Sequence, residues 1–205
     1  MKDTGTSFKR DFNGLKIGFA VTGSFCTISD AIPQLEEMVN QGADVYPIMS
    51  EMTHSTDTRF GKAADLVWQM ESATGRKVIC TISGAEPIGP GNMLDALVIA
   101  PCTGNTLSKM AGGINDSAVT MAAKAHLRNL KPLVIGISTN DGLGANAKNI
   151  GLLQNTKNIF FVPYRQDDAI GKCNSLISDM TLIMPTLIEA LANRQIQPMF
   201  ATIND

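Results

Sequence analysis

The chain of 205 residues carries a net charge of −2, with 44% hydrophobic and 18% charged residues. This near-neutral charge provides no strong positive field, which argues against nucleic acids and anionic membranes as partners. No apolar run approaches the roughly 20 residues of a membrane-spanning helix, and the polar first residues lack the apolar core of a signal peptide. The length suffices for one α/β domain with a substantial core.

The cysteines are widely spaced, at Cys26, Cys80, Cys102 and Cys173. They form no C-x-x-C pair and no cluster with histidine, so the sequence predicts no metal site. A chain of this length without an export signal favours free thiols in a reducing cytoplasm. We therefore expect no disulfide framework.

Apolar runs alternate with segments of helical periodicity along the chain. In chain order we expect a strand at 15–21, a helix around 32–39, a strand at 44–49, a helix at 63–73, a strand at 77–82, a loop at 83–92, a strand at 94–100, helices at 105–111 and 116–129 with Asp116 as N-cap, a strand at 133–137, a helix at 145–154, a strand at 158–162 and a closing helix at 176–192.

Strands that are apolar along almost their whole length predict a parallel sheet with both faces covered. The expected fold is therefore an α/β, three-layer Rossmann-like or flavodoxin-like fold with about six strands. We expect one domain over residues 14–198, preceded by a flexible arm at 1–13 and followed by a tail at 199–205. In such a sheet, ligands bind at the carboxyl ends of the strands.

Short polar side chains follow four of the predicted strands. They are Thr22-Gly23-Ser24, Ser50, Thr103-Gly104-Asn105-Thr106 and Ser138-Thr139-Asn140. Hydroxyl groups, a glycine and a helix N-terminus together can hold a phosphate, although 22–24 is also consistent with an ordinary strand-to-helix turn. The chain has neither the G-x-G-x-x-G nor the G-K-[ST] signature, which argues against a bound NAD or a Walker loop. The four segments together predict a nucleotide or flavin site.

The remaining chemically reactive side chains give no catalytic assignment. His126 lies among alanines and leucine on a predicted helix, which favours a structural role, and His54 follows a strand in a polar stretch. A thiol beside a flavin can be reactive, but Cys102 at a tight turn is more typical of a small space-filling residue. The catalytic residues stay unassigned.

The segment 101–116, PCTGNTLSKMAGGIND, resembles the P-A-S-A-N-T…K-x-A-x-G-I-x-D block of the FMN-binding flavoprotein family. This family includes cysteine decarboxylases and flavin prenyltransferases. Residues 17–24 look like its first strand and phosphate loop. The resemblance extends over 15–198 and implies a flavodoxin-like sheet, non-covalently bound FMN and a homo-oligomer built from trimers.

The resemblance also implies roles for individual residues. Ser24 and Ser50, with Gly23, would meet the FMN phosphate. The ribityl chain and ring would lie against Thr103, Asn105 and Thr106, with Ser138 and Thr139 on the far side of the ring.

Two departures from the family pattern bear on the reaction. The decarboxylases carry a catalytic histidine before the fourth strand, where this chain reads AEPIGP at 85–90. They also carry P-x-M-N-x-x-M-W after the fifth strand, where this chain reads STNDGL at 138–143. Both differences argue against cysteine decarboxylation.

Within the family, the blocks 43–50, 56–63, 136–141 and 166–168 resemble the flavin-binding chain of a two-component oxidoreductase. That enzyme oxidises a cyclic dicarboxylate to an aromatic one in the mother-cell cytoplasm of spore-forming bacteria. The resemblance implies a partner chain with its own nicotinamide site and a small dicarboxylate substrate. The alternatives are a stand-alone FMN-dependent decarboxylase or flavin prenyltransferase, and a non-catalytic scaffold with the flavoprotein fold.

Overall fold

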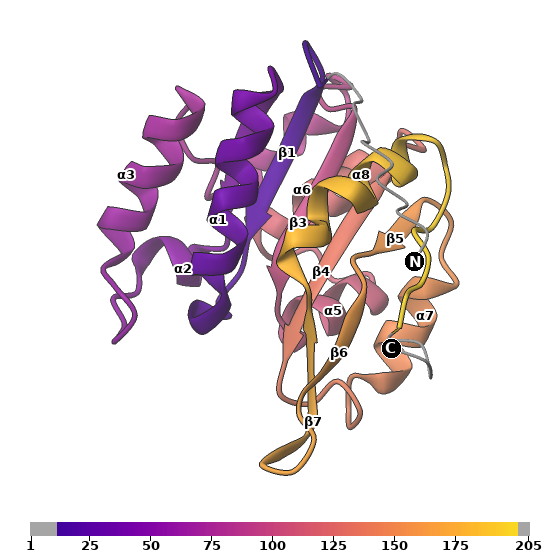
Figure 1. Cartoon of the computed structure of the whole chain (residues 1–205). Helices are drawn as coiled ribbons and strands as arrows, with labels where there is room; N and C mark the ends of the chain where they lie inside the picture. Colours follow the sequence, from indigo (N-terminus) through magenta and orange to yellow (C-terminus); the bar gives the residue numbers. More distant parts are fainter. Residues whose placement is uncertain (1–11, 201–205) are drawn as a thin grey trace, which may run out of the picture.

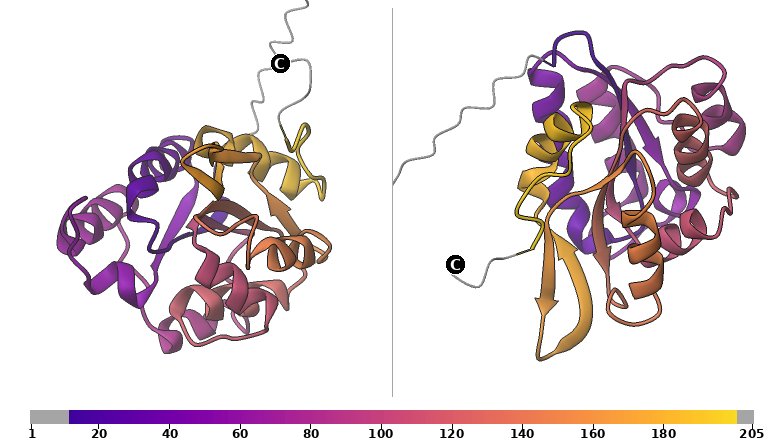
Figure 2. Two further views of the ribbon diagram at one scale, coloured as in Figure 1. Left: turned by 90° about the horizontal axis from the view of Figure 1, so that it is seen from below. Right: turned by 90° about the vertical axis from the view of Figure 1, so that its right-hand side faces the viewer.

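A sheet of seven strands lies between two layers of helices in residues 12–200, the part of the chain that the computed structural model describes (Figures 1 and 2). The strands are β1 (Lys16–Val21), β2 (Asp44–Met49), β3 (Ala96–Cys102), β4 (Leu133–Thr139), β5 (Ile159–Phe161), β6 (Tyr164–Asp168) and β7 (Lys172–Ser178). The helices are α1 (Phe25–Asn40), α2 (Glu51–Ser55), α3 (Ala63–Thr74), α4 (Ile82–Ala85), α5 (Gly104–Ala111), α6 (Ala118–Leu127), α7 (Ala147–Gln154) and α8 (Ile183–Leu191), with 3₁₀ turns η1 (Glu86–Ile88) and η2 (Met180–Leu182).

The sheet is mostly parallel, with the strand order β2-β1-β3-β4-β7-β6. One edge of β4 serves two partners: β5 pairs in parallel with its amino-terminal half, and β7 pairs antiparallel with Ser138 and Thr139. The expected fold class is confirmed. The parallel strands β1 to β5 run to a common carboxyl end, beyond which the β6–β7 hairpin projects (Figure 1).

Two hydrophobic cores flank the sheet. All seven residues of β3 are buried, because helices cover both of its faces. One core joins the sheet to α1, α3 and α8, and includes Leu35, Met70 and Leu187. The other joins it to α5, α6 and α7, and includes Leu107 and Val119.

The strand expected at 77–82 does not form. This segment makes a single bridge between Ile79 and Ile48, with hydrogen bonds to the neighbours of Ile48 in β2. Just before the bridge, the Glu71 side chain on α3 accepts a hydrogen bond from the Val78 N–H at 3.1 Å and pairs with Lys77 at 2.7 Å. These side-chain contacts replace the ladder that the apolar pattern predicted.

The prediction of a loop at 83–92 is also partly wrong, because α4 overlaps its start and η1 lies within it. Thr81 starts α4 by accepting a hydrogen bond from the Gly84 N–H at 3.1 Å. Gly89 then packs against α6, where an added Cβ would lie 3.1 Å from the Ala125 carbonyl oxygen. Gly89 therefore serves close packing against α6 as well as the turn.

The closing helix expected at 176–192 begins later than predicted. Residues 164–178 form the β6–β7 hairpin, and α8 starts only at Ile183. Asp168 makes the turn, because its Oδ1 accepts from the N–H groups of Ile170 and Gly171. Asp116 is likewise not the N-cap of α6: Ser117 takes that role in a reciprocal capping box with Thr120.

The two ends of the described chain pack against the fold. Phe12, placed in the expected arm, is 1% exposed and belongs to the core. Phe200, placed in the expected tail, packs edge-on against Tyr164 at a ring distance of 5.0 Å. The rest of the expected arm and tail, 1–11 and 201–205, lies outside the described residues.

The outer edge of β5 is covered by one side chain. Gln195 accepts a hydrogen bond from the Phe161 N–H at 2.8 Å and donates one to the Phe161 carbonyl at 2.7 Å. Its amide therefore makes the pair of bonds that a neighbouring strand would make. Among residues 12–200, no helix is both long enough and apolar enough to cross a membrane.

Candidate functional site

The ends of β1 and β3 are joined through one buried hydroxyl. Thr22 is 1% exposed, and its Oγ1 donates to the Pro101 carbonyl at 2.7 Å. The same oxygen accepts from the Thr103 N–H at 3.0 Å. Thr22 therefore fixes the start of the loop after β3 relative to the loop after β1.

Three hydroxyl groups meet at the carboxyl end of the sheet. Ser24 Oγ lies 2.6 Å from Ser138 Oγ, and Thr27 Oγ1 lies 2.8 Å from the same Ser138 oxygen. Ser24 is the N-cap residue of α1, but its side chain makes no capping bond to that helix. The first turn of α1 holds no acidic residue, so nothing there offsets the positive end of the helix dipole.

Ser50 lies at the end of the neighbouring strand and is held to β1, because its N–H donates to the Val21 carbonyl at 3.1 Å. Its Oγ accepts from the Thr53 N–H at 3.2 Å and lies 2.8 Å from Thr53 Oγ1. A Cβ placed on Gly23 would lie 3.9 Å from the same Thr53 oxygen. Gly23 and Ser50 thus both lie beside the Thr53 hydroxyl.

The loop after β3 leads directly into α5. Thr103 is the N-cap of this helix, and its Oγ1 accepts from the Thr106 N–H at 3.4 Å. Thr106 is 6% exposed, whereas the Asn105 side chain is exposed to solvent. Asn105, the second residue of α5, is therefore open to contact by a ligand.

The predicted site residues fall into groups of neighbours. Ser24 and Ser138 are in direct contact, Gly23 adjoins Ser50 through Thr53, and Thr103 is bonded to Thr22. Thr139 is hydrogen-bonded to a neighbouring side chain. Its Oγ1 donates to the Asp141 carboxylate at 2.5 Å, so its hydroxyl hydrogen is already used within the protein.

Two contributing residues, Thr27 and Thr53, were not predicted as site residues, whereas Thr22 was named as part of the segment 22–24. A sequence signal for Thr27 and Thr53 exists. The helices after β1, β2 and β3 each begin with a hydroxyl-x-x-Thr pattern: Ser24–Thr27, Ser50–Thr53 and Thr103–Thr106. This spacing places an N-cap hydroxyl beside the third helical residue.

The acidic residue after β2 has a structural partner. Glu51 Oε1 accepts from the Ala118 N–H at 2.9 Å, at the first turn of α6. A carboxylate at that position accepts from an otherwise unpaired helix N–H and interacts favourably with the positive end of the helix dipole. Glu51 thus ties the end of β2 to the opposite helix layer.

Two candidate reactive groups are buried away from solvent. Cys102 is 0% exposed, and burial strongly raises the pKa of its thiol, which keeps it protonated and unreactive. His126 is 0% exposed and lies 2.9 Å from the Pro132 carbonyl oxygen through Nε2. Burial lowers the pKa of His126 to about 4, so the ring is neutral at pH 7.

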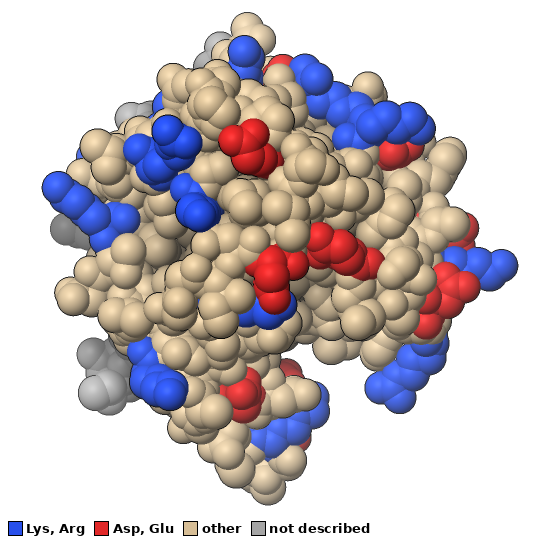
Figure 3. Space-filling view, turned by 180° about the vertical axis from the view of Figure 1, so that it is seen from behind, with Lys and Arg blue, Asp and Glu red and all other residues tan. Residues whose placement is uncertain are grey.

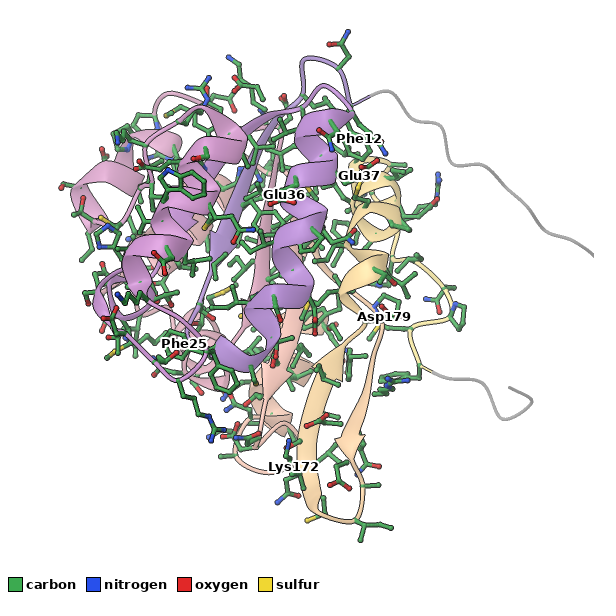
Figure 4. All side chains as sticks on the ribbon, turned by 60° about the vertical axis from the view of Figure 1, so that its left-hand side comes forward. Phe12, Phe25, Glu36, Glu37, Lys172 and Asp179 are labelled. Carbon is green, nitrogen blue, oxygen red and sulfur yellow. The ribbon has the colours of Figure 1, made fainter. Side chains whose placement is uncertain are left out.

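The β6–β7 hairpin carries several charged side chains at this end of the molecule. Lys172 Nζ pairs with Asp167 at 2.8 Å, and Lys172 and Phe25 of α1 lie at the same end of the molecule (Figure 4). On the opposite helix layer, acidic and basic side chains are interspersed over the face that Figure 3 shows. Within residues 12–200, no three His, Cys, Asp or Glu side chains are grouped as metal ligands.

Comparisons with known proteins identify similar chains. The flavoprotein family matches residues 6–192. The B subunit of dipicolinate synthase from Bacillus subtilis (strain 168) is 50% identical over 186 residues, which cover 91% of this chain and 93% of that protein. The crystal structure of the same B subunit from Bacillus halodurans C matches with a TM-score of 0.87 at 44% identity, over 94% of this chain and 99% of that one.

A more distant solved structure, the FMN binding protein AtHal3, matches with a TM-score of 0.62 at 20% identity, over 85% of this chain and 95% of that one. At this identity the likeness concerns the fold. The resemblance expected from the segment 101–116 is confirmed by the family match, which spans most of the chain. On this basis, the chain belongs to the flavoprotein family.

Proposed function

We propose that this chain binds FMN at the carboxyl end of its sheet and serves as the flavin-binding B subunit of dipicolinate synthase. In this role it oxidises a dihydrodipicolinate-type intermediate to dipicolinate, together with the A subunit of that enzyme. The proposal rests on the similarity to known B subunits and on the hydroxyl-lined end of the sheet. The observation that carries it is the meeting of Ser24, Thr27 and Ser138 beside the N-terminus of α1.

These residues fit a phosphate. Hydroxyl groups donate hydrogen bonds to phosphate oxygens, and the N-terminal end of α1 carries partial positive charge. The absence of an acidic residue from the first turn of α1 avoids repulsion. Ser50 and Gly23 border the same end of the sheet, where Gly23 keeps the backbone open to a close approach.

The loop after β3 fits the ribityl chain and the ring. Asn105 offers an exposed amide with both donor and acceptor groups, and Thr103 and Thr106 keep the backbone beside it in place. Bound FMN would supply the hydride acceptor, while the protein binds and orients the substrate. Cys102 takes no chemical part, because its thiol is buried and protonated.

The remaining parts of the proposal come from the family resemblance. They are a small dicarboxylate substrate, an A subunit with its own nicotinamide site, a homo-oligomer built from trimers and a location in the mother-cell cytoplasm of a spore former. The similarity to a protein named as one subunit of a synthase supports a partner chain.

The experiment has two stages. The purified chain is titrated with FMN, and flavin fluorescence and the thermal unfolding midpoint are followed. Ligand at a hundredfold excess over its dissociation constant stabilises the folded state by about 2.7 kcal/mol, so a clear rise of the midpoint is expected. A chain that neither changes flavin fluorescence nor gains stability contradicts the proposal.

In the second stage, dipicolinate formation is assayed with the A subunit present, with and without FMN. Asn105→Ala is compared with Asn155→Ala, a matched control at the far end of α7. We expect Asn105→Ala to lose both flavin and activity while keeping its unfolding midpoint, because the side chain is exposed. Unchanged activity of the complex would instead identify a scaffold.

A further inference from the structure

A group of side-chain hydrogen bonds at this end of the sheet joins α5 to α7 and to the loop after β4. We propose that Asn146 and Asp141 form a positioning pair, termed here the α5 clamp, which fixes the first turn of α5 so that Asn105 faces the flavin. This inference rests on the proposed function, because it assigns a purpose to that turn. Neither residue touches the proposed ligand, so both act through α5.

The centre of the clamp is Asn146, which is 3% exposed. Its Nδ2 donates to Asp141 Oδ2 at 2.8 Å. Its Oδ1 accepts from Ser108 Oγ at 2.8 Å and from Asn149 Nδ2 at 2.9 Å. One buried amide therefore joins α5, α7 and the loop after β4, and buried amides of this kind are costly to leave unpaired.

Asp141 connects the clamp to the end of β4. Its Oδ1 accepts from Thr139 Oγ1 at 2.5 Å, while its Oδ2 accepts from Asn146. Both carboxylate oxygens are thus used within the protein. This arrangement gives Thr139 a positioning role beside the clamp.

The clamp contacts α5 at two points one turn apart. Ser108 is bonded to Asn146, and Gly104 lies directly against the polar cluster. A Cβ on Gly104 would lie 2.5 Å from Asn146 Nδ2 and 2.6 Å from Asp141 Oδ1. Residues at positions i and i+4 share one face of a helix, so this face is fixed while the exposed Asn105 points elsewhere.

The hydrogen-bond pattern allows an exchange test. Asn146→Asp places a second carboxylate against Asp141, which removes a donor and adds repulsion. The double variant Asp141→Asn/Asn146→Asp restores every bond: the new amide at 141 donates to the new carboxylate at 146 and still accepts from Thr139. The carboxylate at 146 still accepts from Ser108 and Asn149. Lys148→Ala, on the exposed face of α7, is the control.

Three measurements are made on the full chain: the FMN dissociation constant, the circular dichroism of the flavin band at saturating FMN, and hydrogen exchange of the 105–107 amides without FMN. For Asn146→Asp we expect a dissociation constant raised by about tenfold, an altered flavin band and faster exchange. The double variant should return all three towards the wild-type values, and Lys148→Ala should leave them unchanged.

The outcomes separate the two proposals. If the wild type fails to bind FMN, the proposed function is wrong, while the exchange data still test whether the clamp orders α5. If the wild type binds FMN but Asn146→Asp has the same affinity, flavin band and exchange, the clamp is wrong. A loss in Asn146→Asp that the double variant does not recover also overturns it, because general destabilisation would then explain the effect.

Discussion

The Ser24 and Ser138 hydroxyl oxygens lie 2.6 Å apart across the end of β3, the strand that separates β1 from β4 in the sheet. β1 and β4 are not adjacent in the sheet, yet Ser24, which follows β1, meets Ser138 of β4 beyond the end of β3, which lies between them. This contact encloses the end of β3 and brings the N-terminus of α1 to the same place as the loop after β4. It is the structural basis for the proposed phosphate site.

Replacing Ser138 tests that contact directly. Ser138→Ala removes the hydroxyl that both Ser24 and Thr27 contact, so we expect FMN to bind about five- to tenfold more weakly. The free energy of unfolding should change by only about 1 kcal/mol. Isothermal titration and urea unfolding measure the two effects. Ser72→Ala, at an exposed position of α3, should change neither; equal affinity in both variants would count against the phosphate site.

Two glycines should respond in opposite ways to the same substitution. Gly104→Ala would place a methyl group 2.5 Å from Thr139 Oγ1, and we expect it to destabilise the fold by about 1–3 kcal/mol. Gly151 lies inside α7 with no atom near its added Cβ. Alanine there should stabilise the fold by about 0.5–1 kcal/mol. Urea unfolding of both variants compares them, and a stabilising Gly104→Ala would contradict the close packing.

His126 should make the protein less stable as the pH falls. Its folded pKa of about 4 lies below the ordinary histidine value of 6.5, so between these values the unfolded chain binds a proton that the folded chain does not. Stability is therefore complete above pH 6.5 and falls by up to about 1.4 kcal/mol per pH unit towards pH 4.

In His126→Gln this titration is absent, while a side-chain N–H remains for the Pro132 carbonyl. We expect a flatter stability profile between pH 6.5 and 4.5 than in the wild type. Urea unfolding at several pH values in this range provides the comparison. Parallel profiles would show that His126 does not cause the slope.

The cysteines should differ in reactivity with their exposure. Cys26 and Cys173 are exposed, whereas Cys102 is buried with a raised pKa. Treatment of the native protein with iodoacetamide, followed by mass spectrometry, should therefore modify Cys26 and Cys173 and spare Cys102. All should react in denaturant. Rapid native modification of Cys102 would mean that the end of β3 opens to solvent.

Much of the fold was predictable because its strands are apolar along their length and alternate with amphipathic helices. β1, β2, β3 and β4 lie within a residue or two of their expected ranges. The segment 77–82 has the same apolar character, but it makes only one bridge to β2, and the Val78 N–H is bonded to the Glu71 side chain. A side-chain contact of this kind depends on tertiary structure and leaves no local pattern.

The hairpin was missed for a different reason. Residues 165–174 are mostly polar and all exposed, so the alternation that marks a strand is weak. The Asp168 turn before Gly171 was the available signal. At the site, the strand ends were predictable because they carry short polar residues. Which hydroxyls pair with one another was not, since Ser24 and Ser138 are far apart in the sequence.

Gln195 gives the sheet a further property. An open strand edge offers unpaired backbone groups to any extended peptide, and such edges promote fibril growth and unwanted assembly. By bonding the Phe161 N–H and carbonyl, this single amide leaves neither group free to pair with another chain. Together with the three-residue length of β5, this cap leaves little of that edge open to pairing with another chain.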